Sequence, residues 1–137
     1  MPRKDVFVLD TSALLTLRAD EPGASRVDGL LQQARQTHLP PLLVSFMTRM
    51  EILYCVWREE GEEEARHSLR LIESFPIEWV SCEPGILDIA SRLKAQGGMS
   101  VADSWIAATA VAREATLVHK DPEFRKFKEV SQEFLRR

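Results

Sequence analysis

The sequence predicts an α/β fold with three layers, α/β/α, around a central and mainly parallel sheet of four to five strands. Short apolar runs alternate with longer segments of helical periodicity along the chain. Strands that alternate with helices pair in parallel, because each connection places a helix against one face of the sheet. The length of 137 residues is typical of one domain, so we expect a single domain over residues 1–137.

Short apolar runs are the strand candidates, and longer periodic segments are the helix candidates. Strands are expected at 6–9, 42–44, 77–80 and 116–118. Helices are expected at about 11–18, 24–36, 45–59, 62–74, 84–95 and 100–113. Breaks rich in glycine and proline separate them, at Asp20–Gly23, Pro40–Pro41, Gly61 and Gly97–Gly98. The tail beyond Asp121 is expected to form a short amphipathic piece.

The charge of the chain bears on its partners. A formal net charge of −3 argues against a generally basic nucleic-acid-binding protein. The segment from Glu59 to Glu64 is strongly acidic and is most simply a solvated helix junction. Basic residues are enriched toward the C-terminal end, at Lys120, Arg125, Lys126, Lys128, Arg136 and Arg137. A small and transient RNA contact is therefore compatible with the overall negative charge.

We expect a cytoplasmic protein with no membrane segment. No apolar run approaches the ~20 residues that span a bilayer, and Val6–Leu9 is too short for the apolar region of a signal peptide. Cys55 and Cys82 are isolated and lack zinc-type spacing, which favours two buried free thiols in a reducing cytoplasm. Apolar patterning favours core packing for all the tryptophans, Trp57, Trp79 and Trp105.

Asp10, Glu51, Asp103 and Asp121 lie at the edges of apolar segments, where solvated carboxylates are not expected. Asp10 follows the first strand candidate and Asp121 follows the fourth, and α/β sheets bind ligands beyond the carboxyl ends of their strands. Carboxylates that converge repel one another unless a positive group, most often a metal ion, compensates. The acids therefore predict one site for a hard divalent cation such as Mg²⁺.

Helix capping is the competing interpretation of each acid. Asp10 precedes an expected helix, and Asp121 precedes a proline, which is favourable at a first helical position. Glu51 and Asp103 each lie three residues after a threonine or serine, the spacing of a capping box. Their apolar neighbours at helical spacing, however, turn both carboxylates toward the core. Capping explains single acids and leaves this shared direction unexplained.

Four stretches of the chain resemble the motifs of PIN-domain nucleases. They are Val8-Leu9-Asp10-Thr11-Ser12, Ser45-x-x-Thr48-x-x-Glu51, the segment Met99–Ala110 around Asp103, and the segment Leu117–Phe124 around Asp121. Their order, their spacing and the chain length suit the small prokaryotic members, including VapC-type toxins of toxin–antitoxin pairs. The resemblance covers essentially the whole chain, is most specific in the third stretch, and implies a PIN-like form of the predicted fold.

The resemblance implies a metal-dependent endoribonuclease, because PIN domains mostly cut RNA and hold Mg²⁺ or Mn²⁺ in an acidic cluster. On this sequence it makes Asp10, Asp103 and Asp121 the principal metal ligands. Glu51 would bind through water or a second ion and orient the attacking water. All of these acids would be catalytic. A VapC-type toxin would also have a small antitoxin partner and form a homodimer, and we expect both contacts at apolar edges of the helices at 24–36 and 62–74.

The chain also offers residues whose role the resemblance leaves open. Thr11 and Ser12 are candidates for contacts with a phosphate or with a metal-bound water, and ordinary first-turn polarity is their alternative. His119 stands where PIN domains often have threonine, and Glu123 stands where they often have aspartate. As the last residue of a strand, His119 is expected to be structural.

Other functions fit the sequence to different degrees. A haloacid-dehalogenase-type phosphatase needs a second aspartate two residues after Asp10, where this chain has Ser12. A receiver domain needs an adjacent acidic pair before its first helix, which is absent from the sequence. An RNA-processing nuclease, a structure-specific DNA nuclease of the same fold and a catalytically weak PIN-like RNA- or protein-binding module stay open. The chain leaves little room for the extra clamp helices of a DNA-directed enzyme.

Overall fold

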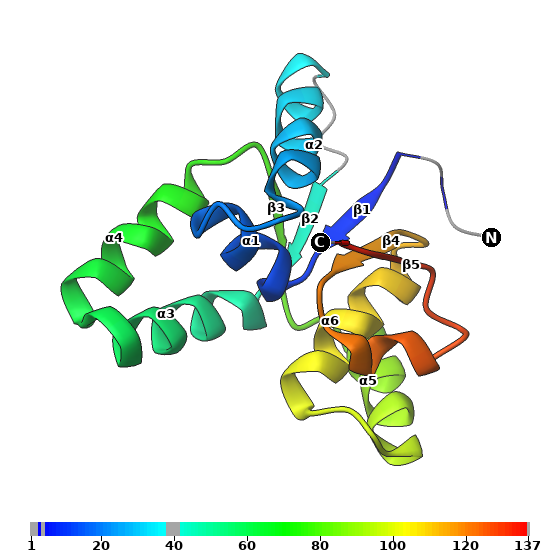
Figure 1. The fold of residues 1–137 in the computed structure, drawn as a ribbon. Coiled ribbons are helices and arrows are strands. Elements are labelled where there is room, and N and C mark those ends of the chain that lie inside the picture. The colour runs from blue at the N-terminus through cyan, green and yellow to red at the C-terminus, as the bar shows by residue number, and fades with distance from the viewer. Residues whose placement is uncertain (1–2, 4, 38–41, 137) are drawn as a thin grey trace.

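A computed structural model describes residues 3, 5–37 and 42–136, so the expected break at Pro40–Pro41 and the basic residue Arg137 lie outside the described residues. The described residues form a five-stranded sheet in the order β3-β2-β1-β4-β5, and every neighbouring pair is parallel (Figure 1). The strands are β1 (Phe7–Leu9), β2 (Leu42–Ser45), β3 (Glu78–Val80), β4 (Thr116–His119) and β5 (Gln132–Phe134). The predicted three-layer α/β/α fold is confirmed.

Helices fill the connections between the strands, as the periodicity predicts. They are α1 (Thr11–Arg18), α2 (Ala24–Gln36), α3 (Met47–Glu60), α4 (Glu62–Glu73), α5 (Pro84–Gln96), α6 (Val101–Ala112) and the short 3₁₀ helix η1 (Pro122–Lys126). Gly61 has a φ of 94° and Gly97 a φ of 84°, a region that favours glycine, and these residues end α3 and α5.

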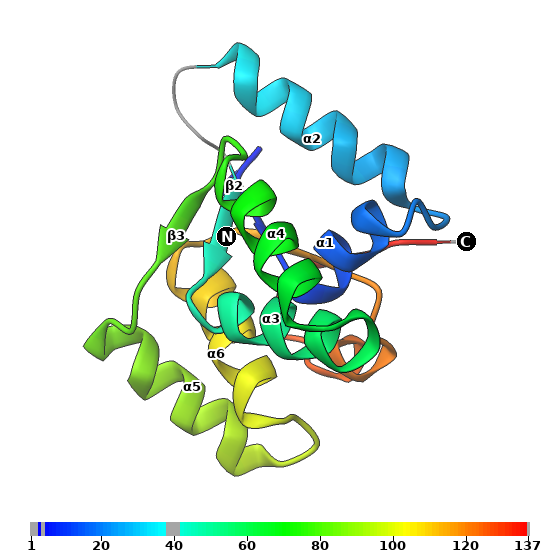
Figure 2. The same cartoon turned by 90° about the vertical axis from the view of Figure 1, so that its left-hand side faces the viewer.

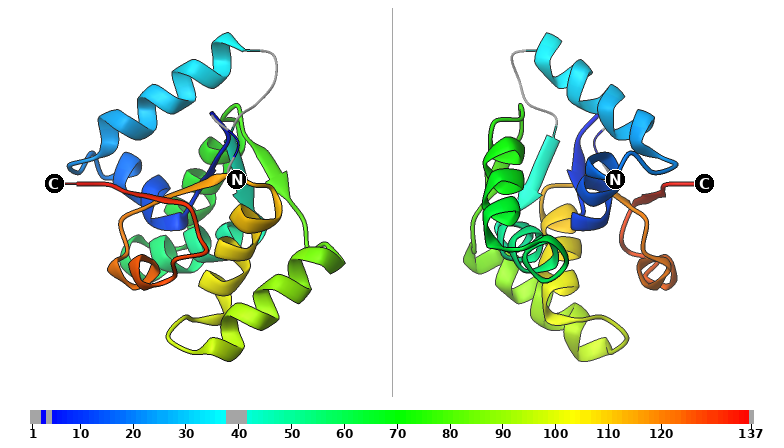
Figure 3. Two further views of the ribbon diagram at one scale, coloured as in Figure 1. Left: turned by 90° about the vertical axis from the view of Figure 1, so that its right-hand side faces the viewer. Right: turned by 60° about the vertical axis from the view of Figure 1, so that its left-hand side comes forward.

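The two faces of the sheet carry separate apolar cores. Val8, Leu43 and Leu117 point to one face, which α5 and α6 cover. Leu9, Val44 and Val118 point to the other, which is covered mainly by α1, α2 and α4. The views in Figures 2 and 3 show α5 and α6 gathered on the side away from α2. This alternation along β1, β2 and β4 is the period of two that a strand buried on both faces requires.

The strand order creates a switch point at β1. From β1 the chain moves outward through β2 to β3, and then returns across the sheet to β4, on the other side of β1. Phe7 pairs with both Leu42 and Thr116, so β1 is hydrogen-bonded on both edges. Open α/β sheets bind ligands beyond the carboxyl ends of the strands at such a point. The segments after Leu9 and His119 therefore border the expected site.

Several smaller expectations were wrong. The tail forms η1 and a fifth strand, β5, which pairs with β4. Cys82 is exposed and Cys55 is half-buried, so the two free thiols are not both in the core. Trp57 is 43% exposed, because it lies on the outer side of α3.

Within the described residues, none of the helices is long and apolar enough to span a bilayer.

Candidate metal centre

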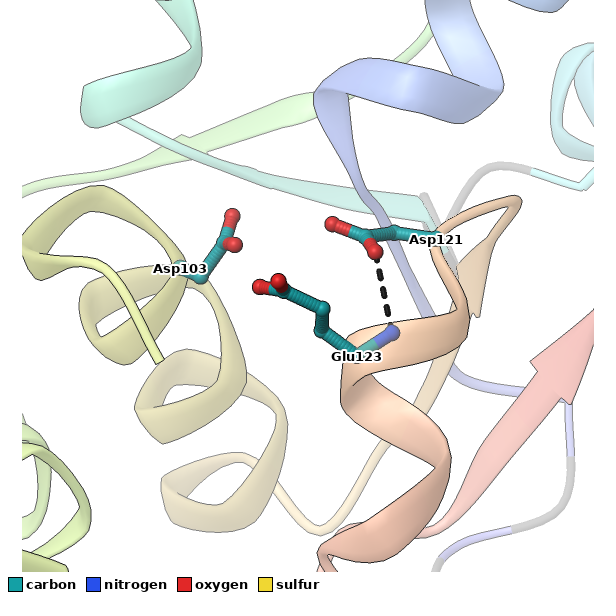
Figure 4. Close-up of side chains that lie close together, drawn as sticks. All are labelled: Asp103, Asp121 and Glu123. Carbon is teal, nitrogen blue, oxygen red and sulfur yellow. Dashed lines mark hydrogen bonds between the residues drawn. The ribbon is translucent and has the colours of Figure 1, made fainter. Parts of the chain in front are cut away.

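The predicted acids come together at the carboxyl edge of the sheet. Asp10 directly follows β1, and Asp121 follows β4 after one intervening residue. Asp103 lies in the first turn of α6. Asp10 and Asp103 are thus both at helix N-termini, where the partial positive charge of the helix dipole favours a carboxylate. Figure 4 shows the carboxylates of Asp103, Asp121 and Glu123 pointing toward one another.

Asp103, Asp121 and Glu123 form the tightest group of acids. One ligand oxygen from each lies within 4.8 Å of the others, close enough to share a single cation. The backbone N–H of Glu123 donates to Asp121 Oδ1 at 3.0 Å, so Asp121 caps η1. Asp103 and Asp121 are half-buried, whereas Glu123 is exposed. Sequence reasoning treated Glu123 only as a departure from a pattern, although its place two residues after Asp121 was a usable signal.

Asp10 is the buried acid of the site. Its side chain is 4% exposed in the folded chain. Oδ2 accepts hydrogen bonds from the backbone N–H and the hydroxyl of Ser12. Asp10 therefore caps α1, as expected. Oδ1 is buried and has no hydrogen-bond partner among the described residues. Burial, opposed by the Ser12 hydrogen bonds and assisted by Asp103 and Glu51, raises the pKa of the Asp10 carboxyl to about 7.

Glu51 is held at the site by a threonine. The Thr11 hydroxyl donates to Glu51 Oε1 at 2.7 Å and lies 3.0 Å from the Thr48 hydroxyl. Glu51 itself belongs to the second turn of α3, which begins at Met47 without a side-chain cap. A capping box at Thr48 is therefore wrong for Glu51. The charge of Glu51 contributes to raising the pKa of both Asp10 and Asp103.

Thr11 and Ser12 both contact carboxylates in this structure. Thr11 is buried and bonded to Glu51, and Ser12 is bonded to Asp10. The Ser12 hydroxyl also accepts the backbone N–H of Lys120 at 2.9 Å, which ties the start of α1 to the end of β4. Thr11 thus links the start of α1 to Glu51 on α3, and Ser12 links it to the segment that follows β4. A direct contact of either hydroxyl with phosphate stays a prediction.

The acids of the site lack the basic partners that acids elsewhere have. Ion pairs among the described residues engage other glutamates, for example Glu60 with Arg18 at 2.8 Å and Glu133 with Arg26 at 2.9 Å. In the part of the chain that the structure describes, no arginine or lysine forms an ion pair with Asp10, Glu51, Asp103, Asp121 or Glu123. Burial, followed by the charges of Glu51, Asp121 and Glu123, raises the pKa of the Asp103 carboxyl to about 6.

This donor set fits a hard divalent cation. All of its atoms are oxygens, which Mg²⁺ and Mn²⁺ prefer. Asp10 Oδ1 offers a buried lone pair without a partner, and the group at Asp121 offers three further oxygens. A cation would supply the positive charge that the described residues do not. Asp10 and Glu51 lie outside the tightest group, so the structure adds Glu123 to the predicted acids and leaves the division of ligands among them open.

Capping and site membership turn out to be compatible. Ser100 accepts the N–H of Asp103 at 3.1 Å and caps α6, while Asp10 and Asp121 cap α1 and η1 through one oxygen each. The caps fix the backbone of each helix start. Because a carboxylate has two oxygens, Asp10 and Asp121 can cap with one and present the other to an ion.

Comparisons with known proteins agree with this architecture. The chain matches the family model of the PIN domain over residues 7–130. No curated protein matches the chain in sequence. Among solved structures, the chain is similar to VapBC2 from Rickettsia felis, which was solved bound to a DNA fragment from its promoter. The TM-score is 0.76 at 18% identity, and the match covers 96% of this chain and 99% of that one. DNA-bound VapBC from Salmonella typhimurium has a TM-score of 0.76 and 17% identity, with coverages of 96% and 98%. VapBC-1 from nontypeable Haemophilus influenzae has a TM-score of 0.70 and 21% identity, with coverages of 95% and 98%.

Proposed function

Because this chain belongs to the PIN-domain family, we propose that it is a metal-dependent endoribonuclease of the cytoplasm and the toxin of a toxin–antitoxin pair. The observation that carries the proposal is the gathering of Asp10, Glu51, Asp103, Asp121 and Glu123 without a basic partner among the described residues. A bound cation would stabilise such a group in its ionised form. Mg²⁺ or Mn²⁺ is the cation that its oxygen donors suit.

The residues of the site divide the work of phosphodiester hydrolysis. A bound divalent cation supplies an activated water and stabilises negative charge on the phosphate. Asp103, Asp121 and Glu123 would hold the cation, and Asp10 would complete the ligand set through Oδ1. Glu51, fixed by the Thr11 hydroxyl, would accept a hydrogen bond from the attacking water and orient it.

This mechanism predicts the chemical ends of the products. The attacking oxygen comes from water, so the RNA 2′-hydroxyl is not the nucleophile. The products should therefore carry a 5′-phosphate and a 3′-hydroxyl. Fragments that end in a 2′,3′-cyclic phosphate would contradict the mechanism, and mass spectrometry of the fragments distinguishes the two outcomes.

One cleavage experiment separates this function from its alternatives. The wild type, Asp103→Asn and Asp88→Asn are each incubated with single-stranded RNA, structured RNA and DNA, with Mg²⁺, Mn²⁺ or EDTA. Asp88 is exposed on α5, so its variant is a matched control for the change of aspartate to asparagine. We expect RNA cleavage that needs the metal and is lost in Asp103→Asn alone. Cleavage that survives EDTA would refute the proposal, and a protein that binds RNA without cutting it would be the catalytically weak module.

A groove between α1 and α4 is the proposed site of the antitoxin. It has a volume of about 490 Å³. Its lining combines five apolar residues with five polar or charged ones: Leu14, Leu17, Leu71, Ile72 and Phe75, and Arg18, Glu60, Glu64, His67 and Ser68. Leu71 is 55% exposed, whereas no large apolar residue of α2 is exposed among the described ones. The similar structures named above include complexes described as VapBC. A groove of this kind suits an apolar face of a partner helix.

The antitoxin proposal is tested with the product of a neighbouring small reading frame. Co-expression with the wild type should yield a complex that no longer cuts RNA. Leu71→Glu should weaken the complex while the free protein cuts RNA at the wild-type rate. A complex that tolerates Leu71→Glu and Leu17→Glu would place the partner elsewhere.

A second apolar surface suits a homodimer. Met50, Tyr54 and Trp57 lie at helical spacing on one side of α3 and are 63%, 40% and 43% exposed. Exposed apolar stripes of this kind commonly mark protein interfaces. We propose that a second copy covers this stripe, and expect light scattering to report a dimer for the wild type. Trp57→Glu should give a monomer, and a dimer that persists in Trp57→Glu and Met50→Glu would contradict this placement.

A further inference from the structure

His119 departs from the PIN pattern, and the structure encloses it completely. The residue ends β4 and has no exposed surface. Its ring lies between those of Phe124 and Phe134, with edge-on contacts and centroid separations of 5.0 and 5.5 Å. A phosphate therefore cannot reach the imidazole. The ring nitrogens of His119 must act on other parts of the protein.

The partner of His119 has an orientation that chemistry fixes. The side-chain nitrogen of Gln132 lies 2.9 Å from the carbonyl oxygen of Phe124 and 3.2 Å from those of Phe127 and Val130. Carbonyl oxygens only accept hydrogen bonds, so the amide nitrogen of Gln132 must face them. The amide oxygen, Oε1, then faces His119 Nε2 at 2.9 Å.

This orientation determines where the imidazole carries its proton. Gln132 Oε1 can only accept, so His119 Nε2 must be the protonated nitrogen. His119 Nδ1 is then a free lone pair, and it accepts the backbone N–H of Asp121 at 3.2 Å. Three backbone carbonyls thus select one neutral tautomer, and that tautomer binds the backbone of an acid at the metal centre.

We propose that His119 and Gln132 are positioning residues for the half of the metal centre that Asp121 and Glu123 form. Gln132 holds the segment that follows Glu123, and His119 holds the segment that precedes it. Neither side chain touches the carboxylates. Their effect passes through the backbone of Asp121, whose Oδ1 accepts the N–H of Glu123. The inference rests on the proposed metal site and gives β5 a role, because β5 carries Gln132.

Two substitutions of His119 separate its two hydrogen bonds. In His119→Asn the amide oxygen can occupy the position of Nδ1, so the bond to Asp121 survives while the link to Gln132 is lost. In His119→Gln the amide nitrogen can occupy the position of Nε2, so the link to Gln132 survives while the bond to Asp121 is lost. Thr116→Val is the matched control, because it removes a side-chain hydrogen bond to Ser131 that does not involve Asp121.

The test measures hydrogen exchange of the Asp121 amide in the metal-free protein and the Mn²⁺ dissociation constant by electron paramagnetic resonance. His119→Gln should lose protection at Asp121 and bind Mn²⁺ about 10–100-fold more weakly, as expected for loss of an outer-shell partner. His119→Asn should retain more of the amide protection at Asp121 and more of the Mn²⁺ affinity than His119→Gln. Thr116→Val should lower the free energy of unfolding. It should still bind Mn²⁺ within about twofold of the wild type, because its lost hydrogen bond does not position a metal ligand.

Specific results would overturn the proposal. It fails if His119→Gln keeps Asp121 protected and binds Mn²⁺ like the wild type, or if Thr116→Val weakens Mn²⁺ as much. It also fails if nitrogen NMR finds the proton of the His119 ring on Nδ1. If the wild type itself does not bind Mn²⁺, the proposed metal function is wrong, and the Asp121 exchange and the His119 tautomer still decide whether His119 positions this segment.

Discussion

The two halves of the candidate metal centre hold their carboxylates by different means. On the α1 side, hydroxyl groups bond directly to the acids, Ser12 to Asp10 and Thr11 to Glu51. On the η1 side, no side-chain hydroxyl contacts Asp121 or Glu123 among the described residues. The donors there are backbone N–H groups, that of Asp121 to His119 Nδ1 and that of Glu123 to Asp121 Oδ1. The first half holds its carboxylates with side-chain hydroxyls, and the second depends on the position of the backbone.

This difference indicates how substitutions should act on each half. Loss of a hydroxyl on the α1 side releases a single carboxylate, at a cost that depends on its burial, which is greater for Asp10 than for Glu51. Loss of a hydrogen-bond partner on the η1 side releases the backbone segment that carries Asp121 and Glu123, so both acids are displaced. The two halves also differ in burial, because Asp10 on the α1 side is buried and Glu123 on the η1 side is exposed. Substitutions in the two halves should therefore differ in the size of their effects.

Asp10→Asn should have the largest effect. It replaces a buried ligand by a neutral amide, and the loss in Mn²⁺ affinity should exceed the about 10–100-fold that an outer-shell partner contributes. Calorimetric titration with Mn²⁺ measures it. Asp28→Asn is the control, because Asp28 is exposed on α2 and bonds only to Gln32 among the described residues. Equal Mn²⁺ affinity in the two variants would remove Asp10 from the ligand set.

The pH dependence of stability should report the same buried acid. In the metal-free protein the pKa of Asp10 is raised from 3.8 to about 7, so the folded state holds a proton that the unfolded state has released between these pH values. The free energy of unfolding should therefore be highest below about pH 4 for this group and should fall as the pH rises toward 7. The loss should be several kcal/mol, at ~1.4 kcal/mol per unit of pKa shift.

Denaturant unfolding in EDTA at a series of pH values measures this dependence. Asp10→Asn should flatten most of the fall, and Asp103, whose pKa is raised to about 6, should account for a smaller part. Added Mn²⁺ should restore stability above pH 7, because the ion binds the deprotonated acids. A free energy of unfolding that rises from pH 4 to pH 7 in both proteins would contradict the assignment.

Glu123→Gln should have a smaller effect than Asp10→Asn, because solvent already surrounds its carboxylate. We expect Mn²⁺ to bind roughly tenfold more weakly, a loss as small as that for an outer-shell partner, because water can take the place of this exposed ligand. Glu129→Gln is the matched control, since Glu129 is also exposed and pairs with Arg92 away from the acids. If both variants bind Mn²⁺ equally well, Glu123 is not a ligand.

Sequence reasoning predicted most of this arrangement. The alternation of apolar runs and periodic segments located β1 to β4 and α1 to α6, because each buries enough apolar surface to leave a pattern. β5 left none, since Gln132, Glu133 and Phe134 are only half-buried and pair along one edge. The exposure of Trp57 was missed for a related reason, because an apolar stripe on a helix does not reveal whether its own chain covers it.

The site was predicted less completely than the fold. Asp10, Glu51, Asp103 and Asp121 could be proposed because their surroundings in the sequence are apolar. Glu123 lies in a polar segment and approaches Asp103 only through the turn at η1. The role of His119 depends on Gln132, which lies on another strand, so neither residue alone carries a signal.

Thr11→Val should have the smallest effect. It removes the hydroxyl that fixes Glu51, and the free energy of unfolding should fall by about 1 kcal/mol, the usual net value of one hydrogen bond. The RNA cleavage rate should fall more than Mn²⁺ affinity, because Glu51 would orient water. Thr109→Val is the control, since its buried hydroxyl bonds to the Trp105 carbonyl within α6. A cleavage rate equal to that of Thr109→Val would show that Thr11 does not contribute to catalysis.

The acids at the carboxyl edge of the sheet should bind a divalent cation. Anomalous diffraction from crystals grown with Mn²⁺ would locate that ion among the carboxylates. We expect a manganese peak coordinated by oxygens of Asp103, Asp121 and Glu123 and by Oδ1 of Asp10. Saturating Mn²⁺ with no peak between these carboxylates, in a protein that still cuts RNA, would contradict this expectation.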